Sequence, residues 1–103
     1  MPGATTHTTN AHGLVIGKLK PEANAEDDQQ LVDAFVHSQP LVDESIVSLF
    51  ENAKKHGTAG DTIAVQVDLK IPASNPQAHG VLEAIEQYMA GLPDFKPGSV
   101  EHY

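Results

Sequence analysis

The amino-acid sequence predicts one small α+β domain in which helices pack on one face of a small sheet. Residues 61–72 carry a large apolar side chain at every second position, which is the period of a half-buried strand. Segments 40–56 and 78–92 instead space their apolar residues three and four apart, as amphipathic helices do. The 103 residues suffice for one domain and are too few for two.

The chain is predicted to begin with a disordered tail followed by a strand. Residues 1–12 are small or polar and have no periodicity, so we assign the folded domain to residues 13–103. GLVIGKLK, residues 13–20, is rich in side chains that favour strands, and Pro21 ends it. Its alternation is too weak to predict which of its side chains are buried.

A first helix is expected after this strand. Asn24 can cap it, and Glu26, Asp27 and Asp28 occupy the opening turn, where the helix dipole favours negative charge. The helix is predicted to run to about Ser38, because a proline two residues later disfavours its continuation.

A second helix is predicted over residues 40–56. Pro40 suits the first helical position, and Gly57 follows the basic residues 54–56 as a stop signal. The expected apolar stripe of this helix consists of Val42, Ile46, Leu49, Phe50 and Ala53.

The strand at 61–72, a third helix and a short last strand complete the predicted domain. Pro76 suits the first position of this helix, and Gly91 ends it. The order is therefore β-α-α-β-α, with a short C-terminal strand at 99–103. Two strands alone make a marginal sheet, so a third must come from 99–103, from the tail, or from a second copy paired at a sheet edge. Monomer and homodimer both stay open.

The charge of the chain excludes several classes of partner. Fourteen acidic residues face six lysines, and there is no arginine, so the formal charge is −8. Nucleic-acid binding depends on basic contacts to phosphates, so we expect no nucleic-acid partner. The same balance disfavours polyphosphate substrates and anionic membrane surfaces. A basic protein is the partner that this charge suits, and the alternative is that the charge simply keeps the protein soluble.

The chain has no cysteine, which rules out a disulfide framework and thiolate chemistry. Its first residues lack the apolar run of a signal peptide, and no apolar stretch approaches the roughly 18 residues of a membrane span. We therefore expect a cytoplasmic protein. The six histidines follow no metal-binding spacing, so we expect neither a metal nor a cofactor.

Residues 72–79, PASNPQAH, form the first candidate site, because they lead from the end of a strong strand into a helix. Ligands of α/β proteins often bind at such loops. Ser74, Asn75 and His79 are the candidate ligand-binding residues, with a small anion as the expected ligand. Helix capping alone also accounts for Ser74 and Asn75.

The glycines of HGTAGD, residues 56–61, join a helix to a strand, so we interpret them as a helix stop and a turn.

Acidic residues on the two central helices form the second candidate site. Asp27, Asp28, Asp43 and Glu44 lie in the two predicted first turns and suggest a docking surface for a basic protein. Adjacent residues on a helix diverge, so we expect no catalytic dyad among them. The sequence holds no catalytic motif and favours a non-enzymatic interaction or regulatory module. The alternative is a small-ligand binding protein, or an enzyme, that uses residues 72–79.

Overall fold

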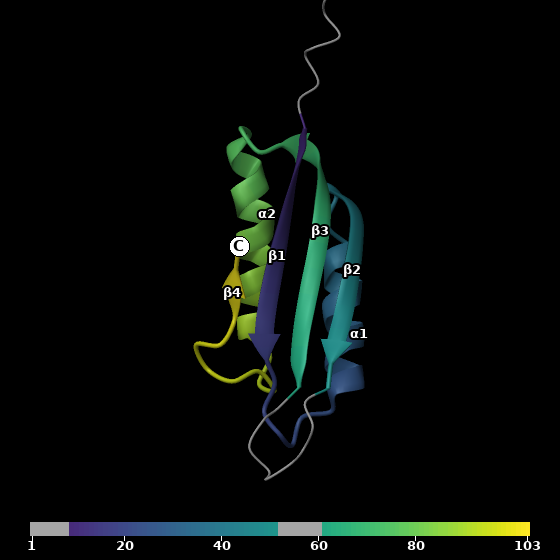
Figure 1. The fold of residues 1–103 in the computed structure, drawn as a ribbon, viewed down its shortest axis with the longest axis vertical. Coiled ribbons are helices and arrows are strands. Elements are labelled where there is room, and N and C mark those ends of the chain that lie inside the picture. Colours follow the sequence, from purple (N-terminus) through teal and green to yellow (C-terminus); the bar gives the residue numbers. More distant parts are fainter. Residues whose placement is uncertain (1–8, 52–60) are drawn as a thin grey trace, which may run out of the picture.

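The computed structural model describes residues 9–51 and 61–103 (Figure 1). Its elements in chain order are β1 (Asn10–Lys18), α1 (Ala25–His37), β2 (Val42–Phe50), β3 (Thr62–Pro72), α2 (Pro76–Ala90) and β4 (Glu101–His102). The strands form one sheet in the order β2-β3-β1-β4, and every neighbouring pair is antiparallel. Both helices lie behind the sheet in Figure 1, so they cover one of its two faces.

The order β-α-β-β-α-β, with β1 and β3 at the centre of the sheet, is the split β-α-β arrangement that is also called ferredoxin-like. Helix α1 connects β1 to β2, and α2 connects β3 to β4. This arrangement hosts many unrelated functions, so it identifies the fold without identifying an activity.

The predicted α+β class, with helices on one face of a small sheet, is confirmed. The strand predicted over 61–72 is β3. The short C-terminal strand is β4, which pairs with β1 at Val15 and Ile16. The chain therefore extends the sheet with its own last residues.

Strand β1 begins at Asn10 rather than at residue 13, so this strand starts three residues earlier than the sequence predicts. Three predictions fall outside the described residues. They are the tail over residues 1–8, the helix end at 54–57, and the HGTAGD turn up to residue 60.

The predicted helix over 40–56 is wrong, because this segment contains strand β2. A spacing of four is an even number, so Ile46 and Phe50 share one face of a strand just as they share one face of a helix. The alternate residues Val47 and Leu49 pair with buried residues of β3 and turn toward the helices. This apolar pattern suits both the helical period and the strand period. It forms a strand here because the segment can pair with β3 in the sheet.

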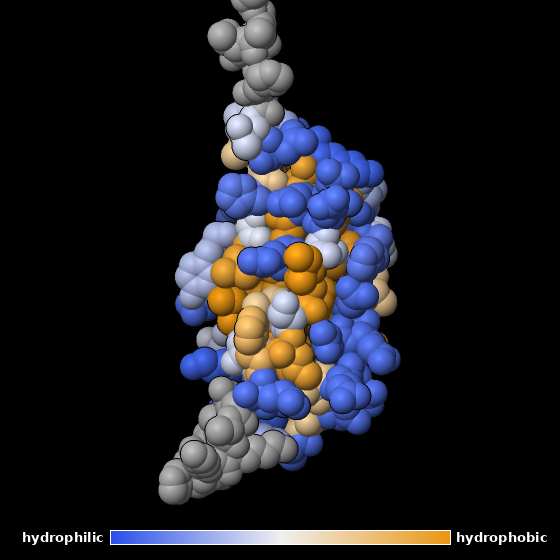
Figure 2. Space-filling model, turned by 45° about the vertical axis from the view of Figure 1, so that its right-hand side comes forward, coloured by the Kyte–Doolittle hydropathy of each residue, from blue (hydrophilic) through white to orange (hydrophobic). Residues whose placement is uncertain are grey.

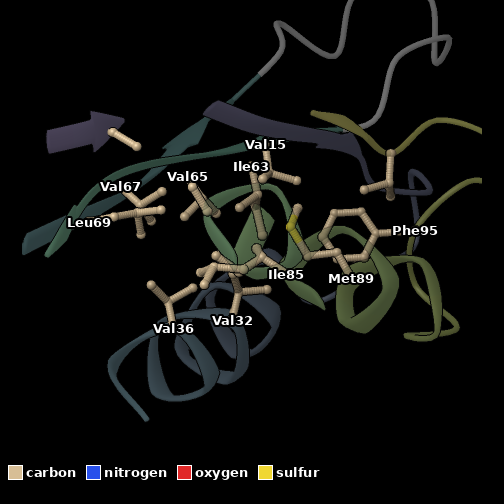
Figure 3. Close-up of a cluster of buried hydrophobic side chains, with 14 of the residues drawn as sticks. Val15, Val32, Val36, Ile63, Val65, Val67, Leu69, Ile85, Met89 and Phe95 are labelled. Carbon is tan, nitrogen blue, oxygen red and sulfur yellow. The ribbon is translucent and has the colours of Figure 1, made fainter. Parts of the chain in front are cut away.

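The hydrophobic core lies between the sheet and the two helices (Figure 3). The ring of Phe35 in α1 stacks on Tyr88 in α2, with ring centroids 4.1 Å apart, so the helices also contact each other. The labelled core side chains are Val15, Ile63, Val65, Val67 and Leu69 from the strands, Val32, Val36, Ile85 and Met89 from the helices, and Phe95 from the following loop.

Helix α2 and the loop after it pack closely on β1, because glycine occupies two helix-facing positions of that strand. A Cβ atom added at Gly17 would lie 2.8 Å from the ring of Phe95, which is itself buried. A Cβ atom added at Gly13 would run into the side chain of Leu82 in α2. Each glycine thus leaves the space that a large side chain fills.

We expect Gly17→Ala to lower the free energy of unfolding by about 1–3 kcal/mol, because the added methyl group must displace the packed Phe95 ring. Gly80→Ala is the matched control: Gly80 is exposed in α2, and an added Cβ would meet nothing within 4 Å. This control should raise the free energy of unfolding by about 0.5–1 kcal/mol. Urea unfolding followed by circular dichroism measures both, and stabilisation by both alanines would contradict the close packing.

Candidate functional site

The sheet has one face that no described element covers, and we call it the open face. Val15 and Val65 are paired and point toward the helices, so the residues that alternate with them point away. The open face consists of His12, Leu14, Ile16 and Lys18 from β1, Glu44, Ile46, Ser48 and Phe50 from β2, Thr62, Ala64, Gln66 and Asp68 from β3, and Glu101 and Tyr103 at the β4 edge.

Large apolar side chains gather on the open face. Ile46 is 60% exposed, Phe50 58% and Tyr103 67%, and among the described residues only Leu31 joins them as an exposed large apolar side chain. Leu31 lies on α1, away from this face. Figure 2 shows an apolar area on the side of the sheet opposite the helices, with polar residues around it. Within residues 9–51 and 61–103, the exposed large apolar side chains are therefore concentrated on the open face.

The open face is hollowed near the β1 and β3 residues His12 and Asp68. The hollow has a volume of about 460 Å³. Leu14, Ile46 and Tyr103 give it apolar walls, while His12 and Asp68 supply polar groups. Glu44 and Gln66 complete its polar lining. A hollow with apolar walls and a few polar groups suits an inserted apolar side chain or a small molecule.

The charges on the open face are separated along the strands. Glu44 pairs across from Asp68, so two carboxylates stand side by side at one end. Lys18 pairs across from Thr62 at the other end. Lys18 lies six residues after His12 along β1, a distance of about 20 Å. The face thus has two carboxylates at one end and one lysine at the other, with Glu101 across from Ile16 at the β4 edge.

Tyr103 has a phenol that stays protonated near neutral pH. Its hydroxyl donates a hydrogen bond to Glu101 Oε2 at 3.3 Å. The negative charge of Glu101 is the main cause that raises the pKa of the Tyr103 phenol, and this hydrogen bond adds to it. The ring therefore offers an uncharged amphipathic group at the β4 edge of the open face.

The spacing of Ile46 and Phe50 alone does not predict this surface, because it favours a buried helical stripe. The β-branched residues of VDESIVSLF, Val42, Ile46 and Val47, are the signal in the sequence that favours a strand. Recognising β2 as a strand places Ile46 and Phe50 together on its solvent side. The apolar surface then becomes visible from the sequence pattern.

The loop at 72–79 leads from β3 into α2, as the sequence predicts. The side chain of Asn75 accepts a hydrogen bond from the Gln77 backbone N–H at 2.9 Å, so it acts as the helix cap. Ser74 is exposed. His79 lies on the surface of α2, with Nε2 3.3 Å from Glu83 Oε2.

His79 contacts His102, which is far along the chain, rather than another residue of the loop at 72–79. Its ring lies edge-on to the ring of His102 in β4, with centroids 5.1 Å apart. His102 Nδ1 in turn contacts a carboxylate oxygen of Glu86 in α2. These contacts tie β4 to α2. Within the described parts of the chain, no group of three or more histidine, cysteine or acidic side chains is arranged to hold a metal ion.

The four acidic candidates do not form one surface. Asp27 is exposed in the first turn of α1, whereas Asp43 and Glu44 are exposed at the start of β2. Strand β2 begins after α1 has ended, so about the length of a 13-residue helix, roughly 20 Å, separates the two pairs. The second helix that would have joined them is β2.

Asp28 is buried, with only 4% of its surface exposed. Burial is the main cause that raises its pKa to about 7, and a side-chain hydrogen bond and the charge of Asp94 raise it further. Its oxygen Oδ2 is buried and has no hydrogen-bond partner among the described residues. Asp28 therefore favours the neutral, protonated form and belongs to the contact between α1 and the loop after α2.

The raised pKa of Asp28 makes stability depend on pH. The folded state holds this proton up to about pH 7, while the unfolded chain releases it near pH 3.8, so stability falls as pH rises between these values. The expected slope approaches about 1.4 kcal/mol per pH unit at most. Asp28→Asn keeps the shape and removes the charge, so it should stabilise the protein at pH 8 more than at pH 4. Urea unfolding at both values measures this, with exposed Asp27→Asn as the control. Equal effects at both pH values would contradict the burial of a protonated Asp28.

No helix within residues 9–51 and 61–103 combines the length and apolar character needed to cross a membrane. Comparison of the chain with protein-family models, with curated proteins and with solved structures finds no match. The open face is therefore the main guide to what this protein does.

Proposed function

We propose that this protein is a non-enzymatic interaction module and that the open face of its sheet is the contact surface. The observation that carries the proposal is the gathering of Ile46, Phe50 and Tyr103, each more than half exposed, on the one sheet face that the helices leave uncovered. Monomeric proteins rarely expose a large contiguous apolar patch, and such patches mark interaction sites.

The energetics favour covering this face. Removing a large apolar side chain from water contributes about 1.5–3 kcal/mol, so burial of the exposed parts of Ile46 and Phe50 contributes to the stability of a complex. Both residues are anchored on a strand, and little ordering is needed before they make contact. The open face is thus a preformed surface with apolar anchors at its centre.

The charges of the face specify the chemistry of the partner. Glu44 and Asp68 stand side by side, so a partner must bring a cation or leave this end in water. The partner we propose is therefore a protein surface with an apolar centre and a basic residue at its margin.

Two other expectations from the sequence stay predictions. Anion binding at residues 72–79 has no contact in its favour, because capping already engages the side chain of Asn75. The cytoplasmic location is likewise an expectation that the fold does not address.

The proposal is tested by placing a photocrosslinking residue, p-benzoylphenylalanine, at Ile46 and irradiating cells that make the protein. The matched control carries the same residue at Leu31, which is 47% exposed but lies on α1. We expect a protein adduct at position 46 and little or none at position 31. Absence of adducts at 46, or equal adducts at both positions, would overturn the open face as a contact surface.

A further inference from the structure

We propose that the partner is a second copy of this chain, packed open face to open face, with the two-fold axis running across the strands. This inference rests on the proposed function and names the occupant of the same surface. The argument comes from the register of the sheet, the distribution of charge and the area of the face.

The register makes the open face complementary to itself. One row of paired residues crosses the middle of the sheet. It consists of Val47 in β2, Val65 in β3 and Val15 in β1. A two-fold axis along this row places the residues on one side of the row, in one copy, opposite the residues on the other side of the row in the second copy. Ile46 then faces Ser48 of the other copy, and Gln66 faces Ala64. Large side chains thus meet small ones on β2 and β3, while on β1 Leu14 faces Ile16 of the other copy, so two apolar side chains meet there.

The same operation brings an exposed aromatic ring to the hollow. Phe50 lies three residues after the central row, and Glu44, which lines the hollow, lies three residues before it. The Phe50 ring of one copy therefore faces the hollow of the other, whose apolar walls include Ile46 and Leu14. An aromatic side chain seated in an apolar pocket is the usual anchor of a protein interface.

Charge selects this orientation over the other face-to-face arrangement. With the axis across the strands, Lys18 of each copy faces His12 of the other, in the row that also carries Asp68 on the neighbouring strand. With the axis along the strands, the acidic ends of both copies would meet. Glu44 and Asp68 of one copy would then lie near Glu44 and Asp68 of the other. Like charges in contact at an interface disfavour that arrangement.

The face has the size of a weak, reversible dimer interface. Strands β1, β2 and β3 have nine or more residues each, lie about 4.8 Å apart and rise about 3.4 Å per residue, so they give a face of roughly 14 Å by 30 Å, to which the two-residue β4 adds little. Each copy thus contributes roughly 420 Å², and the pair roughly 840 Å², which lies in the range below about 1,200 Å² that is typical of transient complexes.

The first experiment is sedimentation equilibrium of the full 103-residue chain over a range of concentrations. We expect a dimer with about twice the 11.0 kDa mass of one chain. Ile46→Glu should raise the dimer dissociation constant at least about 100-fold, because two isoleucines are lost from each symmetric interface. Leu31→Glu is the matched control on α1, and it should leave the dissociation constant unchanged.

The second experiment tests the orientation by charge reversal at about 0.15 M salt, where distant charges are screened. Lys18→Glu should weaken the dimer, and the added change Asp68→Lys should restore its affinity, because the two residues come close only between copies, where Lys18 lies one strand away from Asp68. The control Lys18→Glu/Glu83→Lys has the same net charge. Its new lysine lies on the surface of α2, so it should not restore the affinity.

The outcomes separate this inference from the proposed function. A monomer at every concentration, together with a crosslink from position 46 to a different protein, overturns the second copy and leaves the contact surface in place. A dimer that Ile46→Glu does not weaken overturns the face-to-face contact in favour of pairing at the β2 edge. A dimer that Asp68→Lys does not restore overturns the orientation. Dimerisation with both expected responses supports the proposal in full.

Discussion

The pairing register of β1, β2 and β3 is the constraint on which the rest of the structure depends. Val15, Val65 and Val47 lie side by side and face the helices. Side chains alternate along a strand, so a slip of one residue in any strand would turn its core side chains into solvent. The register that buries these valines therefore also decides which residues make up the open face. The core and the open face are two consequences of one pairing pattern.

The elements that the sequence predicts well are those in which several local signals agree. Strand β3 alternates cleanly, and α2 combines a cap at Asn75 with an apolar face and a glycine at its end. The C-terminal strand is predicted as well, although its length is not. These features depend on neighbours in the chain, which a sequence displays directly.

The elements that the sequence does not predict depend on distant partners. Segment 40–56 has apolar residues that suit a helix or a strand, and pairing with β3 decides between them. The weak alternation of β1 has a related cause, because Gly13 and Gly17 occupy core positions where an apolar side chain would be expected. Glycine suits both positions because the side chains of Leu82 and Phe95 approach the strand closely. Asp28 is buried because Asp94 and the loop after α2 lie against it, which the pattern of α1 does not reveal.

The C-terminal strand has a practical consequence for handling the protein. Tyr103 exchanges two backbone hydrogen bonds with Leu14, and its ring lines the hollow of the open face. Figure 1 places the C-terminus at this margin of the sheet. Any chain that continues past Tyr103, whether a purification tag or a further segment, must therefore leave from the rim of the open face. A bulky addition there would shield the face, so assays of association need a chain that stops at Tyr103 or carries a long linker beyond it.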